Sequence, residues 1–217
     1  MQYWLSLPRS WKPAKSWAVV VVIESADRKF KETAEAFVRT RGAMPFIIVA
    51  PLVTTNGGPS YKESGAYPYT DAIFDEIAKD RWKFDTDGIA AAVADVHRDF
   101  GGEEKYYLTG WEAGGHTVWA MAFDHPELLA AVAPVCPNYA SRYVKWSSDP
   151  SRSSLPIRFF VSDGDPGFGP GSPIFSQCQR AVDEGRSHGF KVSQKVVPGD
   201  VHGPLPGPVL AWFDSLR

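Results

Sequence analysis

Cysteine is scarce in this chain of 217 residues, which contains only Cys136 and Cys178. Two cysteines cannot build the several cross-links by which small secreted domains compensate for a small core. We therefore expect both to be free thiols in a reducing compartment. Because the N-terminal residues also lack the basic-then-apolar order of a signal peptide, the expected location is the cytoplasm.

Neither sign of charge dominates, and no long hydrophobic run is present. The chain has 23 Lys and Arg against 25 Asp and Glu, a formal net charge of -2. Such a balance does not favour a nucleic-acid partner or a membrane surface. The longest strongly apolar run is Trp17–Ile23, whereas a membrane-spanning helix needs about 20 residues. The expected partner is a small molecule, and the oligomeric state stays open.

Short apolar runs alternate with longer amphipathic ones, which is typical of a parallel sheet flanked by helices. Trp17–Ile23 is rich in β-branched residues, as in a strand buried on both faces. Other predicted strands are Pro45–Ala50, Lys105–Thr109, Ala130–Pro134, Pro156–Val161 and Lys191–Val197, and predicted helices are Lys29–Arg41, Thr70–Lys79, Asp85–Phe100, Gly115–Phe123, Ile174–His188 and Pro208–Leu216. Without repeats or an interdomain linker, the sequence predicts one three-layer α/β/α domain over residues 1–217. Its sheet should have about six mainly parallel strands, with Trp17–Ile23 beside Lys105–Thr109.

The stretch after Lys105–Thr109 has the layout of a nucleophile elbow, G-x-S-x-G. In that motif a sharp strand-to-helix turn lifts one side chain above the sheet. Gly110 and Gly114 occupy the glycine positions, but the central residue is Glu112. The turn would hold Glu112 at a positive φ, at a cost of about 1–3 kcal/mol. The following helix N-terminus favours a negative group there by about 0.3–1 kcal/mol.

The order of strand, elbow, strand, acidic turn, helix, strand and histidine loop resembles the α/β-hydrolase superfamily. Within it, the chain resembles the polyhydroxybutyrate-depolymerase-like and feruloyl-esterase-like esterases. The resemblance rests on Tyr107–His116, Trp119–Pro126, Ala130–Pro137, Val161–Phe168 and Val197–Pro206, and extends over residues 15–217. The antiparallel strands that open this fold would be reduced to Tyr3–Leu7. The resemblance implies a hydrolase that acts on a small ester-like ligand without a cofactor or metal.

The resemblance also implies a catalytic acid and base. His202 follows the last strand, where the family has its base, and Asp165 follows Pro156–Val161, where the family has its acid. Asp163 is the alternative, because it lies in the same turn. An acid there accepts the imidazole N–H and fixes its tautomer. His116, by the same resemblance, is structural.

Expected substrate contacts come from three places. The elbow offers Trp111 and Ala113, and the loop after Trp17–Ile23 offers Glu24, Ser25 and Ala26. The long segment Thr54–Tyr69, rich in Gly, Pro, Ser and Tyr, predicts a surface binding loop. Its Tyr61, Tyr67 and Tyr69 either line the site or serve only in packing.

Two departures from the family pattern decide what chemistry is open. Glu112 has no hydroxyl, which excludes ordinary serine-dependent hydrolysis. The family has His-Gly and small residues after the first buried strand, where backbone N–H groups help to form the oxyanion hole. This chain has Glu24, Ser25 and Ala26 at that point.

Several interpretations remain open. A weak or altered hydrolase would use Glu112 as nucleophile, as haloalkane dehalogenases and epoxide hydrolases of this superfamily use Asp, with His202 activating water. An inactive homologue would instead bind a ligand or partner. Alternatively, Glu24, Glu112 and His202 would hold a divalent metal. Replacement of a natural Ser at position 112 by engineering is disfavoured by the simultaneous change at Glu24 and Ser25.

Overall fold

The computed structural model describes residues 1–217 except 57, 59, 170, 200 and 201. Its strands are β1 (Tyr3–Ser6), β2 (Ala18–Ile23), β3 (Phe46–Pro51), β4 (Tyr106–Trp111), β5 (Leu129–Val135), β6 (Ile157–Ser162) and β7 (Val192–Val197). Its α-helices are α1 (Phe30–Arg41), α2 (Asp71–Lys79), α3 (Arg81–Phe100), α4 (Gly114–Asp124), α5 (Pro173–Ser187) and α6 (Pro206–Asp214). Single-turn helices lie at Lys62–Ser64, Pro126–Leu128, Ser141–Tyr143 and Pro150–Ser153.

The strands form one sheet in the order β1-β3-β2-β4-β5-β6-β7. β1 pairs antiparallel with β3, and the other pairings are parallel. The predicted mainly parallel sheet is confirmed, and β1 is the short antiparallel strand expected near the N-terminus. β2 and β4 are direct neighbours, with Val20 opposite Tyr107 and Ile23 opposite Gly110, as predicted.

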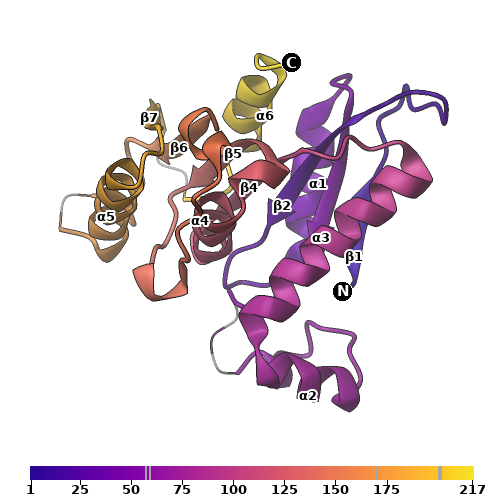
Figure 1. The fold of residues 1–217 in the computed structure, drawn as a ribbon, viewed down its shortest axis with the longest axis horizontal. Coiled ribbons are helices and arrows are strands. Elements are labelled where there is room, and N and C mark those ends of the chain that lie inside the picture. Colours follow the sequence, from indigo (N-terminus) through magenta and orange to yellow (C-terminus); the bar gives the residue numbers. More distant parts are fainter. Residues whose placement is uncertain (57, 59, 170, 200–201) are drawn as a thin grey trace.

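Alternation along β2 shows why the sheet needs helices on both faces. Val19, Val21 and Ile23 belong to the core under α3, α4 and α5. The intervening residues, including Val20 and Val22, belong to the core under α1 and α6. Side chains of a strand point alternately to the two faces, so an entirely apolar strand requires two cores. The three-layer arrangement is visible in Figure 1.

The α-helices begin within four residues of the predicted starts, and polar side chains cap two of them. α3 begins at Arg81 rather than Asp85, since the Asp80 carboxylate accepts a hydrogen bond from the Lys83 N–H at 3.0 Å. α5 begins at Pro173, where Ser172 Oγ accepts from the Phe175 N–H at 3.1 Å. Each cap satisfies an N–H that the first turn of a helix leaves without a partner.

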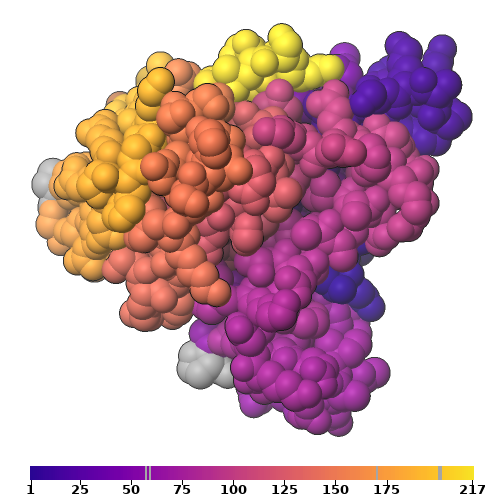
Figure 2. Space-filling view, in the orientation of Figure 1, coloured from indigo at the N-terminus to yellow at the C-terminus, as the bar shows by residue number. Residues whose placement is uncertain are grey.

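The segment 54–69 is not simply the surface loop that its composition predicted. Its residues 57 and 59 lie outside the described part of the chain. Tyr61 and Tyr67 are buried in a small third core with Phe30, Phe74 and Ile77. This position favours a packing role for Tyr61 and Tyr67. They stabilise α2 and the segment that leads into it. That part of the chain protrudes at the lower edge of Figure 2.

Cys136 and Cys178 are both free and buried. Among the described residues, no helix combines the length and the apolar character needed to cross a membrane.

Candidate active site

The turn between β4 and α4 has the geometry of a nucleophile elbow. Glu112 has φ of 49°, in the left-handed region that only a few side chains occupy. Its N–H donates to the Val135 carbonyl at 3.1 Å. Its own carbonyl accepts from the N–H groups of Gly115 at 2.9 Å and Asn138 at 2.8 Å. These backbone bonds, from β5, the segment after it and the first turn of α4, hold the unusual conformation in place.

The two motif glycines are required by close backbone approach. A Cβ on Gly110 would lie 2.8 Å from the Cβ of Ile23, and one on Gly114 would lie 2.5 Å from the Glu24 carbonyl oxygen. Both distances are far below a normal contact. The glycines therefore bring the elbow against the end of β2 and the loop that follows it.

That loop supplies a hydrogen-bond donor to Glu112. The Ala26 N–H donates to Oε2 of Glu112 at 3.2 Å, and Ala26 is exposed. Ser25, in contrast, is engaged within the loop: its hydroxyl donates to Oε1 of Glu24 at 3.1 Å and accepts from the Asp27 N–H at 3.2 Å. The backbone of Ala26, and not the side chain of Ser25, therefore meets the elbow.

Glu24 points into the protein, with 2% of its surface exposed. Burial raises the pKa of this carboxyl, and the polar groups of Thr33, Ser25 and Trp111 lower it by less. A raised pKa favours the neutral acid. Ionisation of Glu24 is therefore less favourable than that of an exposed glutamate.

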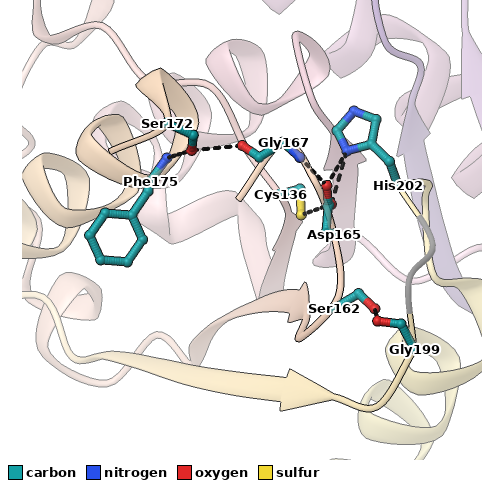
Figure 3. A network of polar contacts seen from close by, with 8 residues as sticks. All are labelled: Cys136, Ser162, Asp165, Gly167, Ser172, Phe175, Gly199 and His202. Carbon is teal, nitrogen blue, oxygen red and sulfur yellow. Dashed lines mark hydrogen bonds and ion pairs between the residues drawn. The ribbon is translucent and has the colours of Figure 1, made fainter. Parts of the chain in front are cut away.

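Asp165, which follows β6, contacts the imidazole of His202. Nδ1 of His202 lies 3.0 Å from Oδ1 and 2.9 Å from Oδ2 of Asp165 (Figure 3). The Asp165 side chain is fully buried, whereas that of His202 is 33% exposed. The pair can thus present the other ring nitrogen to solvent, and Figure 3 shows that nitrogen directed away from Asp165.

Two further donors hold the Asp165 carboxylate. The Gly167 N–H reaches Oδ1 at 2.7 Å, and the Cys136 thiol reaches Oδ2 at 2.7 Å. Burial alone would raise the pKa of Asp165, but the hydrogen bonds from Cys136, His202 and Gly167 outweigh it and lower the pKa. The carboxylate is therefore held in its ionised, accepting form.

Asp163 has a different contact. Its Oδ1 accepts a hydrogen bond from the Gly199 N–H at 2.8 Å. It therefore links the turn after β6 to the chain after β7, while Asp165 faces the histidine. Of the two acids in this turn, Asp165 has the geometry of the acid partner.

Trp111 connects the two halves of the site. Its ring lies 5.5 Å from that of His202 at an interplanar angle of 67°, and it directly precedes Glu112 in the chain. Among the described contacts, no hydrogen bond or ion pair joins Glu112 to His202. Ala113, on the other side of Glu112, is buried, and its carbonyl accepts from the His116 N–H at 3.1 Å in the first turn after the elbow.

The residues suggested as metal ligands are not together. Glu24, Glu112 and His202 do not form a ligand group in the described structure; the group with ligand atoms within 4.8 Å of one another is Cys136, Asp165 and His202. Burial, and then the hydrogen bond to Asp165, raise the pKa of Cys136. A protonated thiol donates to the carboxylate rather than binding a metal as thiolate.

His116 is half-buried against the edge of Tyr143, with ring centroids 5.7 Å apart. Burial lowers its pKa, and Arg142 lowers it further.

Sequence reasoning gave no role to Cys136. Its place at the carboxyl end of a parallel strand was a usable signal, because those ends share one edge of the sheet.

No protein-family model and no curated protein sequence matches the chain. Solved structures do. The chain is similar to the poly(3-hydroxybutyrate) depolymerase LpqC from Bordetella parapertussis, with a TM-score of 0.66 and 20% identity over 99% of this chain and 84% of that one. The fold is that of the α/β-hydrolases.

Other solved structures agree. The S-formylglutathione hydrolase from Agrobacterium tumefaciens has a TM-score of 0.65 and 12% identity, over 98% of this chain and 88% of that one. A thermostable esterase has a TM-score of 0.56 and 19% identity; the match covers 99% of this chain but 55% of the esterase. Identities this low show a shared fold alone, and each activity belongs to the protein so named.

Proposed function

We propose that this chain is a hydrolase that works through a covalent intermediate on Glu112, with His202 activating water and Asp165 orienting His202. The observation that carries the proposal is the hydrogen bond from the Ala26 N–H to Oε2 of Glu112. It holds one carboxylate oxygen and leaves the other, Oε1, for attack. A carboxylate needs no base to act as a nucleophile.

In the first step Oε1 of Glu112 forms a bond to a carbon that carries a leaving group. The carbon–leaving-group bond breaks, and the leaving group takes the electron pair. Attack on an alkyl halide or an epoxide gives a stable ester, whereas attack on an acyl ester gives a reactive anhydride. Alkyl electrophiles are therefore the substrate class that the carboxylate suits best, ahead of the acyl esters implied by the fold.

In the second step His202 removes a proton from water, and the hydroxide attacks the Cδ of Glu112. The carbonyl oxygen of the ester is Oε2, so the negative charge develops where the Ala26 N–H already lies. The Cδ–Oε1 bond then breaks, the departing oxygen takes the proton held by His202, and the product leaves as an alcohol; the new carboxyl group of Glu112 releases its own proton to solvent. For a halide the overall change is R–X plus water to R–OH, a proton and X⁻.

This mechanism needs no direct contact between Glu112 and His202, and none is found among the hydrogen bonds and ion pairs of the described residues. A base that deprotonates a serine must touch the nucleophile, whereas a base that deprotonates water needs room for that water. The hydrogen bonds between His202 and Asp165 supply the support that such a base requires.

The test is turnover of haloalkanes, epoxides and short acyl esters by the wild type and four variants. Glu112→Gln should abolish hydrolysis, and His202→Ala should stop at the ester, which intact-protein mass spectrometry would detect. Asp165→Asn should lower kcat by on the order of 100-fold. The matched control Asp163→Asn should stay close to wild type. Equal effects of the two Asp variants would contradict the assigned roles.

A second function has one observation in its favour. The Glu112 carboxylate occupies the Ala26 N–H, which in a serine hydrolase would be free to bind the carbonyl oxygen of the substrate. An inactive homologue that binds a small ligand would tolerate this arrangement. The absence of turnover and of any adduct across the panel, in the wild type and in His202→Ala, would favour that function over hydrolysis.

A further inference from the structure

Asn56 binds the backbone that carries the Ala26 N–H. The residue is 4% exposed, and its Nδ2 donates to the carbonyl oxygens of Glu24 at 2.5 Å and Ser25 at 3.0 Å. Only the NH₂ end of an amide can face two carbonyl oxygens, because the other end is itself an acceptor. The contact thus ties one buried amide nitrogen to two successive carbonyl oxygens.

The bond to Ser25 has a geometric consequence for Ala26. The carbonyl of Ser25 and the N–H of Ala26 belong to one planar trans peptide and point in opposite directions. Fixing the Ser25 oxygen on one side therefore fixes the direction of the Ala26 N–H on the other. That N–H is the group that meets Oε2 of Glu112.

Asn56 is in turn held by a rigid support. Asp85 on α3 accepts from the N–H groups of Thr54 and Thr55, each at 2.7 Å. The Thr55 hydroxyl lies 2.8 Å from that of Thr117 on α4. The two backbone bonds to Asp85 therefore hold the segment before Asn56 on α3, and they do not depend on the Thr55 hydroxyl.

We propose that Asn56 is a positioning residue: its amide fixes the Ser25–Ala26 peptide so that the Ala26 N–H points at Glu112. The catalytic consequence rests on the proposed function. There the same N–H stabilises charge on Oε2, and loss of one such donor lowers turnover by about 100- to 1000-fold. Asn56 does not touch the reacting atoms, so a smaller loss, of about tenfold or more in kcat, is expected.

The structural arm of the test uses ¹⁵N-labelled protein and needs no activity. Asn56→Ala should speed hydrogen exchange of the Ala26 amide by about tenfold or more and shift its resonance, with global stability measured in parallel by urea unfolding. Thr55→Val is the matched control, because it removes the contact with Thr117 but keeps the Thr55 N–H bound to Asp85. It should leave the Ala26 amide unchanged. An unchanged Ala26 amide in Asn56→Ala would overturn the proposal.

The kinetic arm compares kcat and KM of the same variants. Asn56→Ala should lower kcat with KM changed by less than about threefold, while Thr55→Val keeps both. Equal losses in the two variants would assign Asn56 to general loop packing.

If the wild type has no turnover, the proposed function fails, yet the Ala26 amide still decides the role of Asn56. If Asn56→Ala does not fold, hydrogen exchange of the side-chain NH₂ of wild-type Asn56 provides the measurement. Exchange as fast as that of a free amide would refute the positioning role of Asn56.

Discussion

Gly114 leaves the elbow no room for a side chain. A methyl group there would lie 2.5 Å from the Glu24 carbonyl oxygen and 2.9 Å from that of Ile23, and neither backbone group can rotate away. We predict that Gly114→Ala lowers the free energy of unfolding by about 1–3 kcal/mol, the usual range for overpacking. Urea unfolding measures it. Gly169→Ala is the control, since nothing lies within 4 Å of its added Cβ; a loss equal to that of Gly114→Ala would contradict the explanation.

Cys136 acts on the site through Asp165. Its thiol donates to Oδ2 at 2.7 Å and contributes to the lowered pKa of that carboxyl. Cys136→Ala should therefore raise the pKa of Asp165, while Cys136→Ser, which keeps a donor, should raise it less. A ¹³C NMR titration of the Asp165 carboxyl measures both. The contribution of this hydrogen bond to stability is present at neutral pH and is lost as the pH falls through the lowered pKa of Asp165.

At the scale of elements, the contact between α3 and the segment 54–56 is sensitive to pH. Burial raises the pKa of Asp85 to about 6, although the groups of Thr55 and Thr54 counteract it. The folded state therefore binds a proton more tightly than the unfolded chain. The stability from this proton is complete below pH 4 and is lost as the pH rises through about 6.

We predict that the wild type loses on the order of 2 kcal/mol of unfolding free energy between pH 4 and pH 7 through Asp85. Asp85→Asn should remove this slope while lowering stability overall, because Oδ2 of Asp85 accepts both N–H groups and an amide nitrogen would replace the oxygen that accepts from the Thr54 hydroxyl. Urea unfolding at several pH values gives both quantities. A variant with the same slope as the wild type would assign the pH dependence to other groups.

Sequence patterns predicted the strands better than the helix starts. The run of valines before Ile23 can be buried only in a strand with two covered faces, so β2 was readable from composition alone. The start of α3 depended on a single Asp80 hydrogen bond, and a polar residue in a polar stretch gives no distinct signal. The burial of Tyr61 and Tyr67 depends on where α2 lies, which periodicity does not reveal.

The whole molecule is organised around one sheet whose strands contribute to two cores. Disruption of β2 would expose both cores at once. We therefore predict that residues 1–217 unfold in one cooperative transition. Urea curves from tryptophan fluorescence and far-ultraviolet circular dichroism should share a midpoint, and two separated midpoints would show more than one folding unit.

The positions of the site residues depend on the strand order of the whole sheet more than on any local motif. The elbow, Asp165 and His202 follow different strands, and the parallel order brings their carboxyl ends to one edge. Chain order therefore sufficed to pair an acid of this turn with His202. It could not separate Asp165 from Asp163, which are two residues apart, nor reveal the Ala26 and Asn56 contacts, which depend on the orientation of single peptide groups.

A single-turnover reaction in water enriched in ¹⁸O tests the covalent role of Glu112 most directly. Enzyme in excess over a haloalkane should yield an alcohol with ordinary oxygen, because that oxygen comes from Oε1 of Glu112. The peptide that contains Glu112 should gain the heavy isotope, because water attacks Cδ. A labelled alcohol together with an unlabelled Glu112 peptide would contradict the account, since water would then have attacked the substrate itself.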